Sequence, residues 1–116
     1  MGDEREELLR GAYAAFNARD IERALVLMHR DVDWPNGMEG GRMHGREAVR
    51  EYWTRQFTMI DGHVDPVDIT EHEDGRVAVD VHQVVHSPEG ELLQDTHVTH
   101  TYVFGEDGLV TRMDIG

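Results

Sequence analysis

The first half of the chain carries apolar residues at the spacing of α-helices. A first amphipathic helix is predicted where charged Glu and Arg side chains alternate with an apolar stripe. The members of this stripe are Leu8, Leu9, Ala12, Tyr13 and Phe16. Asp20 suits the cap of a short second helix, which carries Ala24, Leu25, Leu27 and Met28. A third helix is predicted after Gly45, with a stripe of Val49, Tyr52, Trp53, Gln56 or Phe57, and Ile60.

The second half consists of segments rich in β-forming residues, separated by short turns. Strands are predicted at residues 63–71, 76–86, 92–104 and 109–115. The connections between them are short and turn-like, and connections this short force neighbouring strands to be antiparallel. A shorter strand is predicted at 31–34, followed by a loop from Pro35 to Gly45. This order of elements is typical of an α+β fold, and we expect a single domain over residues 1–116.

The predicted strands place apolar residues on both faces of the sheet. Val79 and Val81 mark one face of the strand at 76–86, whereas Asp80 and His82 lie on the other. A sheet with two apolar faces needs cover on both. We interpret the face of Asp80 and His82 as the interior one. The face of Val79 and Val81 is then the surface that a second copy covers, which predicts a homodimer.

Composition narrows the possible partners. Eleven Lys and Arg against twenty-four Asp and Glu give a formal net charge of −13, which repels phosphate backbones, so we expect no nucleic acid. The chain has no cysteine, which excludes disulfides and thiolate metal sites. The acidic N-terminal residues lack the features of a signal peptide, and no apolar run is long enough to span a membrane. We therefore expect a cytoplasmic protein that does not associate with membranes.

Four short motifs resemble those of a known superfamily. They are residues 13–20 (YAAFNARD), 31–34 (DVDW), 45–53 (GREAVREYW) and 108–114 (GLVTRMD). Together with the order of elements, they make nearly the whole chain similar to the nuclear-transport-factor-2-like superfamily, and within it to the SnoaL-like, ketosteroid-isomerase-like branch. The resemblance implies a cone-shaped α+β barrel, with three N-terminal helices packed on a strongly curved, mostly antiparallel sheet around a hydrophobic pocket. It implies no single activity, because this fold hosts many chemistries.

Carried over residue by residue, the resemblance points away from classical steroid isomerisation. The three polar residues that those isomerases use fall here on Asn36, Ala12 and His100, and an amide cannot accept a proton as a carboxylate does. Epoxide-hydrolase-like and SnoaL-like members place an Asp on the last strand, and Asp114 falls at that position. Their aromatic residue and Asn after the first strand correspond to Trp34 and Asn36.

These residues predict a small-molecule enzyme that uses acid–base chemistry. The catalytic candidates are Asp114, His100, Asp80 and His82. In a pocket, Asp114 could transfer a proton, and Asp80 could orient the imidazole of His82 from two positions away on the same strand face. We expect His100 and Asp114 to line one pocket that reaches Trp34. The ligand-binding candidates are Trp34, Asn36, Trp53, Tyr13 and Tyr102.

The predicted reaction is that of an isomerase, a cyclase or an epoxide hydrolase acting on a compact hydrophobic molecule, with no cofactor. Each candidate also has a structural reading, as a solvated carboxylate, a turn residue or a hydrogen-bonded core histidine. The alternative functions are a non-catalytic ligand-binding protein and a dimeric interaction module. A metal site built from His82, His100 and Asp114 is a further alternative, because two His and one carboxylate form a known ligand set.

Overall fold

Helices and strands follow one another much as the hydrophobic pattern predicts. The structure is a computed structural model that describes residues 2–36 and 40–116. Its helices are α1 (Gly2–Asn17), α2 (Ile21–Leu25) and α3 (Arg46–Met59). Its strands are β1 (Met28–Pro35), β2 (Arg42–His44), β3 (Asp61–Glu71), β4 (Val77–His86), β5 (Leu92–Phe104) and β6 (Val110–Ile115).

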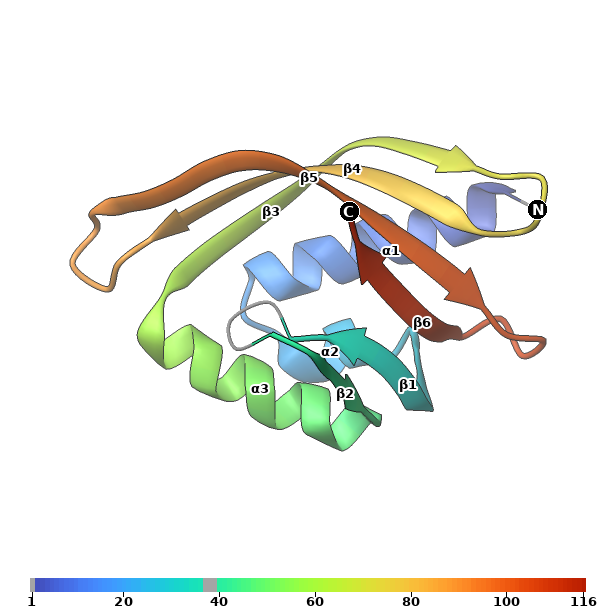
Figure 1. Cartoon of the computed structure of the whole chain (residues 1–116), viewed down its shortest axis with the longest axis horizontal. Helices are drawn as coiled ribbons and strands as arrows, with labels where there is room; N and C mark the ends of the chain where they lie inside the picture. Colours follow the sequence, from blue (N-terminus) through green and yellow to red (C-terminus); the bar gives the residue numbers. More distant parts are fainter. Residues whose placement is uncertain (1, 37–39) are drawn as a thin grey trace.

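The strands form one strongly curved sheet that is mostly antiparallel, in the order β2-β1-β6-β5-β4-β3. Strands β1 and β6 run parallel, and every other neighbouring pair is antiparallel. Four of these pairings contain a register shift, and such irregularities increase bending and twist. The sheet therefore arches over the helices (Figure 1). It does not close into a full barrel, because β2 and β3 remain as its two edges.

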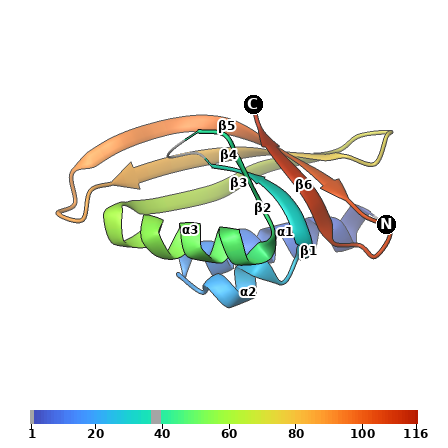
Figure 2. The same ribbon diagram turned by 60° about the horizontal axis from the view of Figure 1, so that its bottom comes forward.

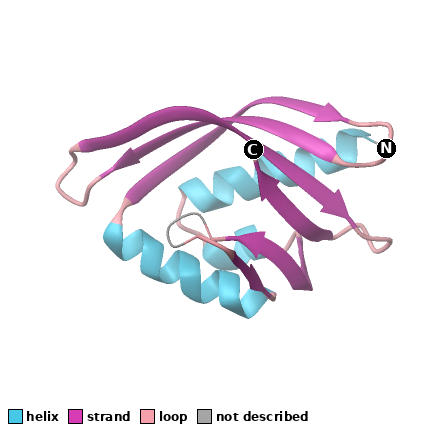
Figure 3. Cartoon of the chain, in the orientation of Figure 1, coloured by secondary structure: helices cyan, strands magenta, loops and turns pink. Residues whose placement is uncertain are grey.

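All three helices pack on the concave face of the sheet (Figures 2 and 3). The core lies between these two layers, and its fully buried members include Leu9 of α1, Val32 of β1, Val49 of α3 and Val110 of β6. The cone-shaped α+β fold is thus confirmed. Among the helices of the described residues, none is long and apolar enough to cross a membrane.

The C-terminal end of α1 is fastened to the sheet edge by one amide side chain. The Asn17 side chain donates to the carbonyl oxygen of Val64 at 2.8 Å and accepts from the amide of Val64 at 2.9 Å. It therefore pairs with β3 as a neighbouring strand would. This contact holds α1 against the edge strand, with Tyr13 one turn back along the helix.

The main departures from the predicted elements lie between α2 and α3. The short helix ends at Leu25, and β1 begins at Met28, so Leu27 and Met28 are not helical. Part of the predicted loop forms β2, where His44 pairs with Asp33. A three-residue edge strand with polar flanks has no hydrophobic alternation to reveal it. Residues 37–39 of that loop lie outside the described residues.

The predicted faces of β4 are wrong. Val79 and Val81 are both 0% exposed and lie in the core beneath the helices, so they are not available to a partner subunit. Asp80 is exposed on the opposite, convex face. The strand pattern fixed which residues share a face, but only the packing of the helices decides which face is interior.

Candidate functional site

A cavity of about 300 Å³ lies between the helices and the concave face of the sheet. This volume is at the lower end of the range of small-molecule pockets, about 300–1,000 Å³. Its walls are mostly apolar and aromatic, and none of the described residues that line it is Asp, Glu, Lys or Arg. The lining residues on which the following description depends are Tyr13, Trp34, Trp53, Gln83, Gln94, His100 and Tyr102.

Three polar side chains meet in the cavity wall and form a continuous hydrogen-bonded chain. The Tyr13 hydroxyl lies 2.9 Å from Nδ1 of His100 and 2.7 Å from the hydroxyl oxygen of Tyr102. All three residues are buried, with exposed fractions of 6%, 8% and 4% respectively. We call Tyr102, Tyr13 and His100 the hydroxyl relay. The relay places three hydrogen-bonded polar groups in a wall that is mostly apolar and aromatic.

The fold explains why these three residues meet. His100 and Tyr102 are two positions apart on β5, so their side chains project from the same face of the sheet. They pair with Val79 and Val77 of β4, whose burial marks this face as the interior one. Tyr13 reaches them from α1, which packs across the same face (Figure 1). Helix α1 therefore contributes the hydroxyl of Tyr13, and strand β5 contributes the hydroxyl of Tyr102.

Burial keeps the relay uncharged near neutral pH. It lowers the pKa of His100 to about 4 because the imidazolium ion would lose its hydration. Burial, reinforced by the neighbouring Tyr102, raises the pKa of Tyr13, and burial likewise raises the pKa of Tyr102. The ring and both phenols are therefore neutral, and they act as hydrogen-bond donors and acceptors.

Two tryptophans form the aromatic wall beside the relay. The rings of Trp34 and Trp53 meet edge to face, with centroids 5.9 Å apart and planes at 87°. Trp34 also lies 6.2 Å from the ring of Tyr102. Edge-to-face and tilted contacts of this kind favour well-defined ring positions. The structure therefore brings together five of the predicted residues: His100, Tyr13, Tyr102, Trp34 and Trp53.

Sequence reasoning missed two glutamines that also line the cavity. Gln83 of β4 donates from Nε2 to Oε1 of Gln94 on β5 at 3.0 Å. They lie toward the β4–β5 turn, away from the relay in sequence and in register. Their positions in the alternation of each strand could have indicated this. Gln83 shares a strand face with Val79 and Val81, and Gln94 shares one with His100.

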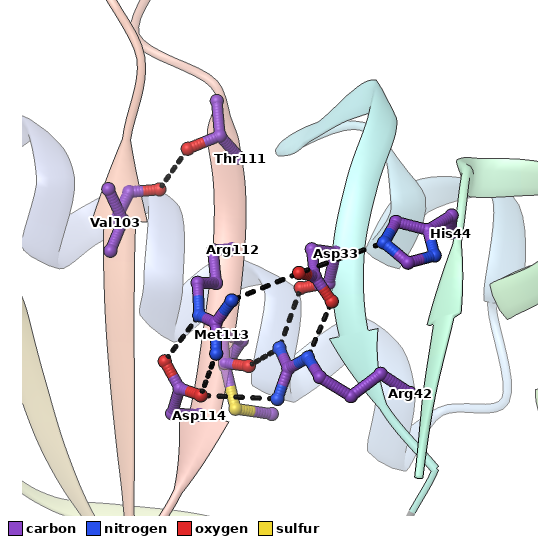
Figure 4. A network of polar contacts seen from close by, with 8 residues as sticks. All are labelled: Asp33, Arg42, His44, Val103, Thr111, Arg112, Met113 and Asp114. Carbon is purple, nitrogen blue, oxygen red and sulfur yellow. Dashed lines mark hydrogen bonds and ion pairs between the residues drawn. The ribbon is translucent and has the colours of Figure 1, made fainter.

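Asp114 does not line the cavity, so the predicted shared pocket with His100 is wrong. Its carboxylate accepts from Arg112 at 2.9 and 3.0 Å and from Arg42 at 3.1 Å. Asp33 accepts from the same two arginines, at 2.5 and 3.1 Å. Figure 4 shows this network of two Asp and two Arg joining β1, β2 and β6. Met113, the residue between Arg112 and Asp114, is the one that points into the cavity.

The network explains the electrostatics of Asp114. The hydrogen bonds and charge of Arg112, with Arg42, lower the pKa of this carboxyl. An acid that transfers protons near neutral pH needs the opposite shift. The Asp114 side chain is 43% exposed. Its position in the last strand matches the resemblance, but its surroundings are those of an ion pair.

Asp80 and His82 also lie outside the cavity and do not form a pair. Asp80 accepts from the hydroxyl of Thr99 at 3.2 Å, and Nε2 of His82 lies 2.6 Å from a carboxylate oxygen of Asp95. The ring of His82 stacks on that of His97, with centroids 4.8 Å apart. These contacts are all on the convex face, opposite to the relay. The register between β4 and β5 explains this placement. It sets His82 opposite His97 and Val79 opposite His100, so the two pairs project from opposite faces of the sheet.

The remaining candidates are not assembled into a site. Asn36 follows β1 and does not line the cavity; its backbone amide donates to the carbonyl oxygen of Gly41 at 3.0 Å. The metal set of His82, His100 and Asp114 is not formed, because His100 faces the cavity and the other two face outward. Within residues 2–36 and 40–116, no group of three or more His, Asp or Glu side chains is arranged to hold a metal ion.

Comparison with known families and structures gives the fold a context. The family model for the SnoaL-like domain matches residues 9–113. The search of curated proteins found no match. The crystal structure of TerC, co-crystallised with polyporic acid, is 30% identical in sequence, with a TM-score of 0.82 over 97% of this chain and 89% of TerC.

Two further structures share the fold at lower identity. SalBIII, an epoxide hydrolase/cyclase-like enzyme in pyran ring formation in polyether salinomycin, is 17% identical, with a TM-score of 0.83 over 98% of this chain and 90% of its own. A Mycobacterium tuberculosis protein crystallised in complex with estradiol-17beta-hemisuccinate is 20% identical, with a TM-score of 0.78 over 91% and 87%. At these identities the likeness concerns the fold alone.

Proposed function

Because this chain belongs to the SnoaL-like domain family, we propose that it binds a compact, largely apolar ketone in its cavity and promotes an isomerisation or cyclisation of that molecule. The observation that carries the proposal is the hydroxyl relay, which ends at His100 in an apolar wall. A polar group in such a wall is a typical orienting element of small-molecule sites. That relatives were crystallised with small organic molecules gives further support.

The relay supports catalysis by polarisation of a carbonyl group. A neutral donor fixed beside a carbonyl oxygen stabilises the negative charge that develops there during enolisation or ring closure. In a wall shielded from water this interaction is stronger than in solution. His100 is the residue assigned to touch the substrate, and Tyr13 and Tyr102 are positioning residues behind it. The proposal invokes no cofactor.

The absence of charge from the described lining restricts the substrate class. None of the described residues that line the cavity is a carboxylate, and His100, with a pKa near 4, is a weak base. The α-proton of the substrate must therefore pass to a water molecule, which a compound with two carbonyl groups on one carbon allows because the hydrogen on that carbon is acidic. Polyketide-like 1,3-dicarbonyl compounds have this property, and we propose them as the substrate class.

The proposal is tested first by binding. We expect 1-indanone, a compact bicyclic ketone, to quench the fluorescence of Trp34 and Trp53, which are the two tryptophans of the chain and both line the cavity. Ala12→Phe fills the cavity from α1 and should abolish saturable quenching. Ala14→Phe adds the same ring at an exposed position of the same helix and should bind like the wild type. Equal quenching in both variants would refute a ligand site in this cavity.

Catalysis is tested separately with ethyl 2-oxocyclopentanecarboxylate, a compact uncharged 1,3-dicarbonyl compound, by following with NMR the exchange for deuterium of the hydrogen on the carbon between its two carbonyl groups. We expect the protein to accelerate exchange by roughly 10²-fold, the lower end of the range for general acid catalysis. His100→Asn should remove this acceleration while the ketone still binds. Acceleration that survives in His100→Asn would show that the relay is not the catalytic group.

A second candidate function is non-catalytic binding of the same class of ligand. The favouring observation is that no described lining residue is a carboxylate, whereas proton abstraction usually employs one. Binding that is sensitive to Ala12→Phe, without faster exchange, would identify this function. The two measurements together separate an enzyme from a carrier.

The homodimer and the cytoplasmic location stay predictions. If a dimer forms, burial of Val79 and Val81 leaves the convex face of the sheet as the surface for it. Sedimentation velocity at micromolar concentration should then give a species of twice 13.3 kDa. A monomer at all concentrations would reject the dimer.

A further inference from the structure

We infer that the hydroxyl relay holds His100 in the tautomer that carries its proton on Nε2, so that the cavity selects a ligand presenting an uncharged hydrogen-bond acceptor to this N–H. The inference deepens the proposed function and rests on it for the position of the ligand. The tautomer itself is a property of the protein without ligand. It can therefore be measured whether or not the proposed function holds.

The number of protons in the relay decides its direction. A neutral imidazole has one N–H and one acceptor nitrogen, and each phenol has one O–H. Among the described residues, Tyr102 has one hydrogen-bond partner for its hydroxyl, which is Tyr13. If Tyr102 donates to Tyr13, then Tyr13 donates to Nδ1 of His100, and the ring proton is on Nε2. Only the Nε2–H group is then left for a ligand.

The opposite direction leaves one buried proton without a partner. Nδ1 of His100 would donate to Tyr13, and Tyr13 would donate to Tyr102. The proton of the buried Tyr102 hydroxyl would then lack a partner among the described residues, whereas Nε2 faces the cavity without a protein partner in both directions. A buried polar group without a partner costs about 1–3 kcal/mol. The direction from Tyr102 through Tyr13 to His100 is therefore favoured.

Nε2 is reachable from the cavity. It has no hydrogen-bond partner among the described residues, since the relay uses Nδ1. Yet no fully buried side-chain nitrogen or oxygen in the described part of the chain lacks a partner. Nε2 is therefore not fully buried, and His100 is part of the cavity lining. The open end of the relay is a donor facing the space where a ligand would lie.

The surroundings exclude a charged acceptor. No described lining residue carries a positive charge, and the whole chain has a formal net charge of −13. A carboxylate or phenolate would lose its hydration without compensation. The acceptor that fits is a neutral oxygen, such as that of a ketone or a quinone. A ligand that offers only a donor finds no acceptor at Nε2.

The tautomer is tested by long-range ¹⁵N–¹H correlation NMR of the ring nitrogens of His100 at pH 7. We expect protonated Nε2 and unprotonated Nδ1 in the wild type and in Tyr102→Phe, which keeps the donation from Tyr13. Tyr13→Phe removes that donation and should give a mixture of tautomers. A proton on Nδ1 in the wild type would overturn the inference. So would an unchanged pattern in a folded Tyr13→Phe protein.

The ligand preference is tested with three bicyclic probes of similar size. 1-Indanone offers an acceptor, indole offers a donor and indane offers neither. We expect 1-indanone to bind about five- to tenfold more tightly than indane, the effect of one net hydrogen bond, and indole to bind no better than indane. A preference for indole overturns the inference and leaves the proposed cavity site standing. If none of the probes binds, the proposed function and the ligand preference both fall, and the NMR pattern still decides the tautomer.

Discussion

His100 is a histidine that folding keeps uncharged, and this makes stability depend on pH. Its ordinary pKa is 6.5, and burial lowers its pKa to about 4 in the folded protein. Between these values the unfolded chain binds a proton that the folded protein does not, so stability falls as the pH is lowered from 6.5 towards 4. Above pH 6.5 both states are neutral and the effect vanishes. A full shift of this size corresponds to roughly 3 kcal/mol.

We expect His100→Asn to flatten this part of the pH profile. Asn keeps an acceptor oxygen near the position of Nδ1 but cannot titrate. Urea unfolding between pH 8 and pH 4 should show a free energy of unfolding that falls less steeply in the variant, by roughly 3 kcal/mol over the range. The other histidines contribute equally to both proteins and cancel in the difference. Parallel profiles would mean that His100 is not held neutral by folding.

At the scale of elements, the junction of β1, β2 and β6 depends on side chains more than on its backbone ladder. The parallel pair β1·β6 has an irregular register, with Met28 opposite Val110 and Asp33 opposite Arg112. Arg42 crosses this junction from β2, donating to Asp33 and to the carbonyl oxygen of Met113, both at 2.5 Å. On the inner side of the same strands lie Trp34 and Met113, which line the cavity.

Arg42→Gln should therefore loosen this junction. We expect a loss of roughly 1 kcal/mol in the free energy of unfolding, the scale of partly exposed ion pairs with added hydrogen bonds. Amide hydrogen exchange in β2 and β6 should become faster. The control is Arg76→Gln, which removes an exposed pair with Asp74 two residues away and should change stability little. Equal effects in the two variants would argue against a stabilising role of Arg42 at the junction.

The stability contributions of this ion-pair network, formed by Asp33, Arg42, Arg112 and Asp114, and of His100 depend on different pH ranges. The hydrogen bond from Arg42 lowers the pKa of Asp33, and that from Arg112 lowers the pKa of Asp114, both from the ordinary value of 3.8. Their stabilising contribution is present above 3.8 and is lost only as the pH falls through the lower folded values. Of these two features, His100 is therefore the one whose contribution is lost between pH 6.5 and 4.

At the scale of the whole molecule, one helical layer covers the concave face and leaves the convex face uncovered (Figure 2). Val79 and Asp80 are neighbours in β4, yet one is 0% exposed and the other is exposed. Val79→Ala should destabilise the protein by roughly 2 kcal/mol because it leaves a cavity in the core. Asp80→Ala, on the convex face, should change stability by no more than about 0.5 kcal/mol. Chemical denaturation of both variants checks this, and the reverse order would mean that the layers are assigned to the wrong faces.

The sequence alone determined the α+β class, the three helices and the four long strands, because the hydrophobic periods of 3.6 and 2 are local properties. It also determined which residues share a strand face, such as His100 with Tyr102 and Asp80 with His82. These patterns, with the resemblance, were enough to place five residues of the cavity wall. The three-residue strand β2 escaped them because three residues with polar flanks show no hydrophobic alternation.

Only the tertiary structure decided which face of each strand is interior. Period-2 alternation is symmetric, so it cannot distinguish the concave face from the convex one when both carry apolar residues. The β4–β5 register couples His100 to Val79 and His82 to His97, which sends the two histidines to opposite sides. The surroundings of Asp114 are likewise set by tertiary structure, because one of its ion-pair partners, Arg42, is 72 residues away in the sequence. The hydroxyl relay exists for the same reason, because Tyr13 and His100 meet only when α1 packs on the sheet.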